Sequence, residues 1–186
     1  SSGSYQWGTI FRNSSPNNGR VDLRGDFVIE ADLYFGTSNA RSGIAFNLTG
    51  FTNYASGNWA YFVSQYQNAL TIEFDTYNDG SFDIANDHSS LHINGNNIAG
   101  TSTLGVTQNS LHNSGYHIQR PINIVDLGNI EDGKWKTFKF SWSASTKTVT
   151  VDFEGQQIMT YQVDIPKDVL NGSNLGYFGF TASGYT

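Results

Sequence analysis

The 186-residue chain contains no cysteine, so it has no disulfide, no zinc–thiolate site and no thiol nucleophile. Only 3 residues are proline and only 14% are charged, whereas 15% are aromatic, a composition unlike that of a disordered chain. No apolar run approaches the roughly 20 residues of a membrane span, and the first residues lack the basic-then-apolar profile of a signal peptide. These absences predict a soluble globular domain.

Basic residues are scarce as well. Lys and Arg together number 10 against 16 for Asp and Glu, which gives a formal net charge of −6. This is the wrong sign for a surface that holds nucleic-acid phosphates. The length corresponds to one domain at about 100–200 residues per domain. We therefore expect one domain over residues 1–186, with residues 1–4 typical of a cloning remnant, and neither nucleic acid nor membrane insertion among its partners.

The hydrophobic pattern has the two-residue period of β-strands. Between Phe27 and Phe35, apolar residues alternate with Glu30 and Asp32. Similar short runs, separated by Asn, Gly, Ser or Asp clusters, cover Ile44–Leu48, Trp59–Ser64, Leu70–Thr76, Trp135–Trp142, Thr148–Phe153, Ile158–Val163 and Tyr177–Thr181. One helical turn is expected over Pro166–Leu170 and one long surface loop over Asn94–Ser114. Many short antiparallel strands without intervening helices predict an all-β sandwich.

Isolated aromatic and histidine residues carry less specific signals. Trp7, Trp135 and Trp142 are expected in the core, since large aromatic residues usually pack there. Trp59 is the tryptophan that we single out as a ligand platform. His92, His112 and His117 lie in polar contexts and are expected to be ordinary surface or hydrogen-bonded residues.

Carboxylates without a nearby basic residue mark one segment of the chain. Between Arg41 and Arg120 there is no Lys or Arg, yet this interval holds Glu73, Asp75, Asp79, Asp83 and Asp87. On a strand, Glu73 and Asp75 point to the same face, about 7 Å apart. A bound cation would relieve their mutual repulsion. Oxygen donors in an Asn/Asp/Gly turn favour Ca²⁺, and His88 would complete a second site for Mn²⁺ or a similar ion. The alternative is a solvated acidic loop.

The register of this segment is more specific than its composition. Glu73-Phe74-Asp75-Thr76-Tyr77 is followed by Asp79, and Asp83 precedes His88 by five residues. This pattern resembles the legume-type (L-type) lectin family. Further resemblance comes from Ser42–Phe46, Asp132–Phe153 and Gly176–Ser183. In detail, the chain looks most similar to lectin domains of bacterial surface adhesins. The resemblance implies a concanavalin A-like jelly-roll sandwich of two large antiparallel sheets.

The resemblance also implies a set of metal ligands. Calcium would be held by Asp75, the Tyr77 carbonyl, Asp79 and Asp83, with Asn78 as the alternative ligand in a turn one residue shorter than usual. A transition metal, possible as a second ion, would be held by Glu73, Asp75, Asp83 and His88.

The predicted sugar site departs from the family pattern. The family places an Asp before the Gly of the Gly-Leu-Ala-Phe strand, where this chain has Ser42 preceded by Arg41. A hydroxyl is a weaker acceptor than a carboxylate. We therefore expect a modified site built from Arg41, Ser42, Gly57, Tyr77, Asp79, Ser183 and Gly184. Arg41 would favour acidic or sialylated glycans; the competing prediction is a neutral sugar bound by stacking and main-chain groups.

Together, these features predict a calcium-dependent carbohydrate-binding module of a secreted or wall-attached bacterial adhesin, with glycans or glycoproteins as partners and no enzymatic activity. One alternative is a laminarinase-type glycoside hydrolase, although Asn78 stands where the Glu-x-Asp-x-x-Glu motif of that class has its last acid. The other alternative is a structural adhesin module that is stiffened by calcium and has no glycan ligand.

Overall fold

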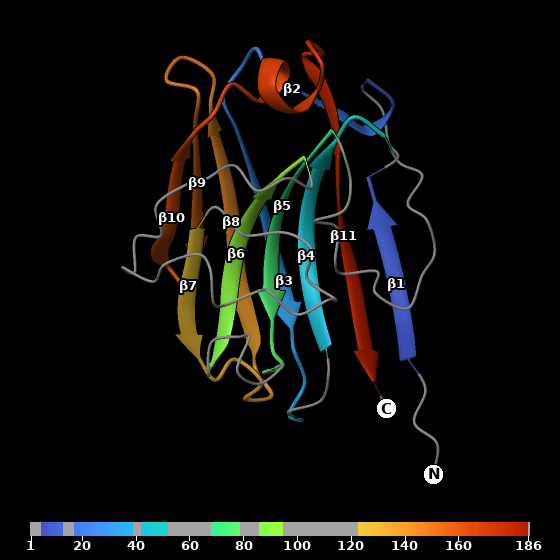
Figure 1. Ribbon diagram of the computed structural model, residues 1–186, viewed down its shortest axis with the longest axis vertical. Helices are drawn as coiled ribbons and strands as arrows, with labels where there is room; N and C mark the ends of the chain where they lie inside the picture. Colours follow the sequence, from blue (N-terminus) through green and yellow to red (C-terminus); the bar gives the residue numbers. More distant parts are fainter. Residues whose placement is uncertain are drawn as a thin grey trace.

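Two antiparallel β-sheets stack face to face in the computed structural model, which describes residues 5–12, 17–38, 42–51, 68–78, 86–94 and 123–185 (Figure 1). The front sheet, as described, has the order β1-β11-β4-β5-β6-β7, with β2 paired to β11. Its strands are β1 (Tyr5–Phe11), β2 (Arg20–Asp22), β4 (Ser42–Thr49), β5 (Ala69–Asp75), β6 (Asp87–Ile93), β7 (Asn123–Gly128) and β11 (Leu175–Tyr185).

The rear sheet has the order β10-β9-β8-β3 within the described ranges. Its strands are β3 (Phe27–Tyr34), β8 (Trp135–Ser143), β9 (Thr148–Phe153) and β10 (Gln156–Gln162). Two short helical segments, η1 (Asn17–Gly19) and η3 (Ile165–Val169), complete the described elements. No helix in the described part of the chain is long and apolar enough to cross a bilayer.

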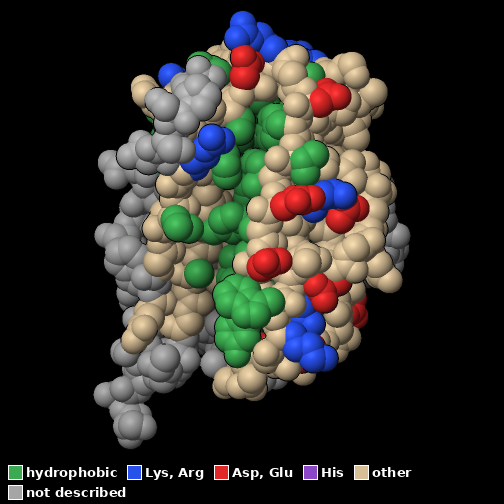
Figure 2. Space-filling model, turned by 180° about the vertical axis from the view of Figure 1, so that it is seen from behind, with side chains coloured by type: hydrophobic (Ala, Val, Ile, Leu, Met, Phe, Trp, Pro, Cys, Tyr) green, Lys and Arg blue, Asp and Glu red, His purple; other side chains and the backbone are tan. Residues whose placement is uncertain are grey.

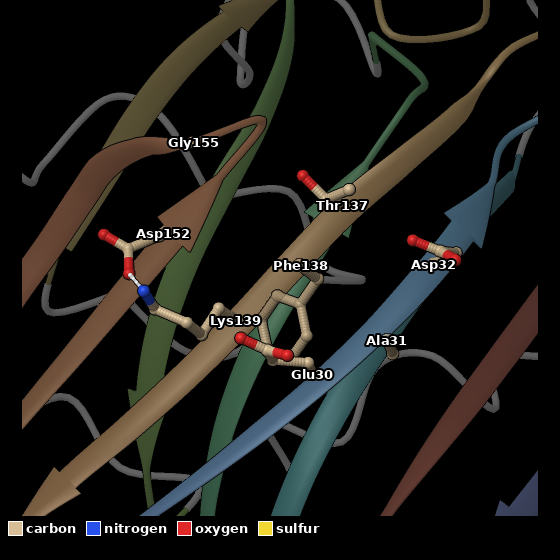
Figure 3. Close-up of a pocket in the computed structure, with 8 residues that line it drawn as sticks. All are labelled: Glu30, Ala31, Asp32, Thr137, Phe138, Lys139, Asp152 and Gly155. Carbon is tan, nitrogen blue, oxygen red and sulfur yellow. Dashed lines mark ion pairs between the residues drawn. The ribbon is translucent and has the colours of Figure 1, made fainter.

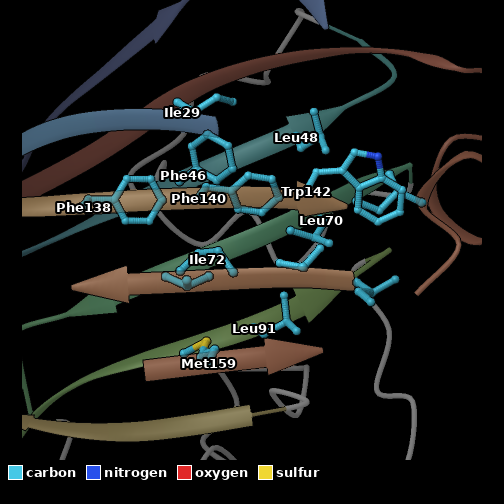
Figure 4. Packing of buried hydrophobic residues seen from close by; sticks show 14 of the residues in the cluster. Ile29, Phe46, Leu48, Leu70, Ile72, Leu91, Phe138, Phe140, Trp142 and Met159 are labelled. Atoms are coloured by element: carbon cyan, nitrogen blue, oxygen red, sulfur yellow. The ribbon is translucent and has the colours of Figure 1, made fainter. Parts of the chain in front are cut away.

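The core fills the space between the sheets and explains the alternating pattern (Figure 4). Phe46 of the front sheet lies at its centre, with its ring centroid 4.8 Å from that of Phe140 and 5.3 Å from that of Phe138 on β8. Trp142 is 2% exposed and donates its indole N–H to the carbonyl oxygen of Leu23 at 3.0 Å. Inward residues of both sheets therefore interdigitate as in other aligned sandwiches.

The predicted strands that fall in the described ranges are confirmed, as is the sandwich. The predicted helical turn is present as η3, shifted by one residue, because Asp164 accepts a hydrogen bond from the backbone N–H of Lys167 and begins the segment there. The expected strand Trp59–Ser64 and the loop Asn94–Ser114, apart from Asn94, lie outside the described residues.

Several strands were not predicted. In β6, Leu91 and Ile93 face the core, and Ser90 and His92 are buried on the opposite face, so its alternation is short and its polar side does not meet solvent. β1, β2 and β7 were not predicted either. Trp135, expected in the core, is 67% exposed; it lies on the outer face of the rear sheet, because β8 alternates strictly and Lys136, Phe138 and Phe140 take the inward positions.

Gly179 provides a test of this packing. A methyl group at Gly179 would lie 2.2 Å from the Ile10 carbonyl oxygen and 2.7 Å from the Phe11 ring, so the two strands must separate in Gly179→Ala. We expect a loss of about 1–3 kcal/mol in the free energy of unfolding, as in other overpacked sites. Gly8→Ala on β1 is the matched control, because nothing lies within 4 Å of its added methyl. Equal urea midpoints for both variants would contradict the β1–β11 pairing.

Candidate functional site

Residues predicted for the metal and the sugar meet at one end of the front sheet, the lower end in Figure 1. Asp75 at the end of β5 lies opposite Gly43 of β4 on one side and His88 of β6 on the other. Gly43 in turn lies opposite Ser183 of β11. Since neighbouring strands are about 4.8 Å apart, these four residues form one continuous row across the sheet.

One residue further along the strands, Ser42 of β4 and Gly184 of β11 lie opposite each other. Both are predicted sugar-site residues. The fold therefore brings Ser42, Ser183 and Gly184 next to the Asp75 row. Four predicted site residues lie outside the described part of the chain: Arg41, Gly57, Asp79 and Asp83. Their roles stay predictions.

Burial of charge is the main property of the candidate site. Ile72 and Phe74 point into the core, which places Glu73 and Asp75 on the opposite face, as the alternation predicts. Yet this face is covered too: Glu73 is 3% exposed, Asp75 0% and His88 1%. Carboxylates at this depth need compensating hydrogen bonds or charge.

Asp75 is fixed by the backbone that follows it. Its Oδ1 accepts a hydrogen bond from the Tyr77 backbone N–H at 2.9 Å, which closes an Asx turn at the end of β5. Asp75 Oδ2 and His88 Nε2 are buried and make no hydrogen bond to the described residues, although both residues take part in other interactions. Tyr77 is half-buried and Asn78 is exposed, so the chain leaves the sheet at this point.

Glu73 is bound by two side chains of β6. Its Oε2 accepts hydrogen bonds from Ser90 Oγ at 2.7 Å and from His92 Nε2 at 2.9 Å, and Ser90 Oγ lies 2.8 Å from the same His92 nitrogen. This geometry assigns the proton of His92 to Nε2. His92 was expected to be a surface or hydrogen-bonded residue. It is hydrogen-bonded but only 6% exposed, and so not a surface residue.

A second polar group follows on the same face. Asn47 of β4 donates a hydrogen bond to Thr181 Oγ1 at 3.2 Å and accepts one from Thr71 Oγ1 at 3.0 Å. Asn47, Thr71 and His92 lie in one row of the sheet. The face opposite the core is thus a hydrogen-bonded layer rather than an apolar one.

Asp87 anchors the start of β6 rather than the Asp75 row. Its Oδ2 accepts a hydrogen bond from the Ile130 backbone N–H at 2.7 Å. Burial raises the pKa of the Asp87 carboxyl above its ordinary value, while that hydrogen bond and His88 act in the opposite direction. Asp87 thereby ties β6 to the segment after β7 and holds the neighbouring His88 in place.

The donor types fit a divalent cation in part. Asp75 offers a hard carboxylate oxygen for calcium, and His88, directly opposite, offers an imidazole nitrogen for a transition metal. Among the described residues, however, no three His, Asp or Glu side chains gather closely enough to hold an ion. Glu73 Oε2 already accepts two hydrogen bonds, and a metal ligated there would have to replace them. The described residues therefore form at most part of a metal site.

Comparison with known proteins places the fold. No family model matches the chain. Among solved structures, it is similar to lectin I from Ulex europaeus in complex with the methyl glycoside of α-L-fucose, with a TM-score of 0.59, 16% identity and coverage of 98% of this chain and 84% of that chain.

The carbohydrate recognition domain of Emp47p gives a TM-score of 0.60 at 16% identity, covering 97% and 79% of the two chains. The chain has the L-type lectin fold. Basic winged bean lectin with Tn-antigen is also similar, with a TM-score of 0.54, 14% identity and coverage of 97% and 80%. The predicted jelly-roll sandwich of two antiparallel sheets is therefore confirmed.

His92 gives the site a stability signature that is independent of any ligand. Removing its ring in His92→Ala deletes a hydrogen bond to a buried carboxylate and leaves a cavity. We therefore expect the free energy of unfolding, measured in EDTA, to fall by about 2–4 kcal/mol. The exposed Thr160→Ala on β10 is the control and should change stability by under about 0.5 kcal/mol. Urea unfolding followed by circular dichroism measures both. A His92→Ala variant as stable as Thr160→Ala would mean that the Glu73 network contributes nothing.

Proposed function

We propose that this chain is a glycan-binding module whose site is organised by calcium at the end of the front sheet. The observation that carries the proposal is the row Ser183–Gly43–Asp75–His88, in which Asp75 and His88, predicted for metal, share one end of the sheet with Ser183, predicted for sugar. The L-type lectin fold supports it, because the similar structures include lectins in complex with sugars.

In this proposal the residues bind the metal and the sugar and catalyse no reaction. Asp75, the Tyr77 carbonyl, Asp79 and Asp83 hold calcium. A second ion would be held by Glu73, Asp75, Asp83 and His88, and Glu73 would then exchange its hydrogen bonds with Ser90 and His92 for the ion. Bound calcium would supply positive charge to the buried carboxylates and fix the turn after Tyr77. The sugar hydroxyls then meet main-chain groups of Ser183 and Gly184 together with Asp79 and Tyr77. A turn that is ordered beforehand lowers the entropy cost of binding.

Two finer parts of the proposal come from the sequence. Arg41 beside Ser42 predicts a preference for acidic or sialylated glycans, and Arg41 lies outside the described residues. The resemblance to adhesin lectin domains supports a secreted or cell-surface location. A glycan array that pairs sialylated with desialylated ligands tests the first part: equal binding by wild type and Arg41→Ala to every pair would overturn it.

Calcium should stabilise the protein, because it binds the native arrangement of carboxylates. At a hundredfold excess over its Kd, an ion that binds only the folded state adds ~2.7 kcal/mol. We expect a higher Tm in CaCl₂ than in EDTA, and loss of that difference in Asp75→Asn. Asp32→Asn on the rear sheet is the matched acid-to-amide control and should keep the full calcium effect. The same Tm in calcium and in EDTA for the wild type contradicts the calcium site.

Binding without turnover separates this proposal from a glycoside hydrolase. Retaining glycosidases need two carboxyl groups about 5–5.5 Å apart, and Glu73 is buried and hydrogen-bonded to Ser90 and His92, with Asn78 at the position of the missing acid. Incubation with laminarin should release no reducing ends. Release that Glu73→Gln abolishes would overturn the binding proposal. A silent assay without binding to any arrayed glycan would favour the calcium-stiffened structural module instead.

A further inference from the structure

The outer face of the rear sheet carries a second set of features that the front-sheet site does not use. Seen from behind, hydrophobic side chains gather at the lower part of this face with acidic side chains beside them (Figure 2). The strict alternation of β3 and β8 decides which residues point outward. Those of β3 are Val28, Glu30, Asp32 and Tyr34, and those of β8 begin with Trp135, Thr137 and Lys139.

Two aromatic rings form an exposed pair at the end of this face. Tyr34 and Trp135 lie opposite each other in the β3–β8 register, with ring centroids 5.3 Å apart and planes tilted by 42°. They are 44% and 67% exposed, respectively. The segments beside them are tied together, because the Gly133 N–H donates a hydrogen bond to the Gly36 carbonyl at 2.9 Å. The pair is thus a fixed apolar platform whose ordering cost is already met by the fold.

A groove of about 420 Å³, lined by Glu30, Asp32, Thr137, Lys139 and Asp152 among others, lies on the same face (Figure 3). The first row beyond the rings pairs Asp32 with Thr137, and the next row runs from Glu30 through Lys139 to Asp152. Lys139 Nζ lies 2.9 Å from Asp152 Oδ2, and this contact raises the pKa of the lysine ammonium above its ordinary value. The groove therefore presents carboxylate acceptors, a hydroxyl and one oriented cation next to two rings.

We propose that the Tyr34–Trp135 platform and the adjoining groove form a second saccharide-binding site, for a neutral pyranose chain. A pyranose has an apolar face of C–H groups that packs on aromatic rings and a rim of hydroxyls that donate to carboxylates. The platform offers the first surface, and Asp32 and Glu30 offer the second. Anionic glycans fit poorly, because three carboxylates face the groove against one lysine.

A second copy of this chain fits the face less well than a sugar does. A two-fold contact sets the same patch against itself, so Glu30, Asp32 and Asp152 of one copy would meet carboxylates of the other. Lys139 is already engaged by Asp152 and cannot neutralise them all. Removing such charges from water without partners is costly. A neutral polyol instead supplies hydroxyl donors to each carboxylate.

The experiment uses the full chain and cellohexaose, titrated in EDTA and followed by tryptophan fluorescence and calorimetry. EDTA separates this site from the calcium-dependent one, so the failure of one proposal leaves the other open. We expect saturable binding in EDTA, weakened at least about tenfold by Trp135→Ala and by Tyr34→Ala. Asp32→Asn should weaken it less. Val28→Ala, on the same face but outside the groove, is the control and should bind as the wild type does; circular dichroism and Tm confirm that each variant is folded.

Three results would overturn the proposal. The first is unchanged affinity in folded Trp135→Ala and Tyr34→Ala. The second is the absence of binding in EDTA, whether binding then appears in calcium and is lost in Asp75→Asn, which would place cellohexaose on the front sheet, or is absent in calcium too. The third is a wild-type dimer in analytical ultracentrifugation that Trp135→Ala converts to monomer, which would identify the rings as a self-association surface.

Discussion

The burial of two carboxylates on one strand is the constraint around which the front sheet is arranged. Glu73 and Asp75 leave water almost completely, and each needs compensation that the core side of β5 cannot give. The neighbouring strand β6 supplies it for Glu73 through Ser90 and His92. The turn after β5 supplies part of it for Asp75 through the Tyr77 N–H. Ser90 and His92 of β6 thus compensate a buried acid of β5.

The charges of Glu73 and Asp75 are compensated in different ways, and the two carboxylates therefore have different roles. Glu73 is engaged by side chains from within the sheet, so its position does not depend on an ion. Asp75 lies at the end of β5, opposite His88, where the chain leaves the sheet. In our proposal, Glu73 is therefore mainly a structural support, and Asp75 is the residue that links the sheet to calcium.

The sequence predicted the strands that have one face toward solvent and the other toward the core. β3 and β8 alternate cleanly, because their outer face meets solvent, and the same alternation assigned Trp142 to the core correctly. The same alternation predicts Trp135 outside, since Trp135 lies an odd number of residues from Phe138, Phe140 and Trp142. The register of the strand there overrides the general tendency of tryptophan to be buried.

The prediction was weaker where both faces are covered. β6 places Leu91 and Ile93 on the core side and Ser90 and His92 on the other side, but this polar side is buried too, because Ser90 and His92 bond to Glu73 rather than to water. His92 lies opposite Thr71 in the strand pairing, one row from Glu73, and that placement follows only from the register of β6. The spacing of Glu73 and Asp75 along one strand thus indicates that the two acids are close together. It does not indicate which residues compensate them, because those residues come from another strand, and the register between the two strands cannot be read from that spacing.

The two faces of the sandwich consequently have different capacities for binding. On the front sheet, polar side chains hydrogen-bond to one another: Asn47, Thr71 and Thr181 form one set, and Glu73, Ser90 and His92 form another. In our proposal, recognition there depends on the row that ends at Ser183 and on the turn after Tyr77. On the rear sheet, Glu30 and Asp32 remain directed at solvent, and Tyr34 and Trp135 are exposed beside them. A ligand on the rear face would therefore meet side chains directly, whereas a ligand at the front would meet mainly backbone and groups held in place by the buried acids.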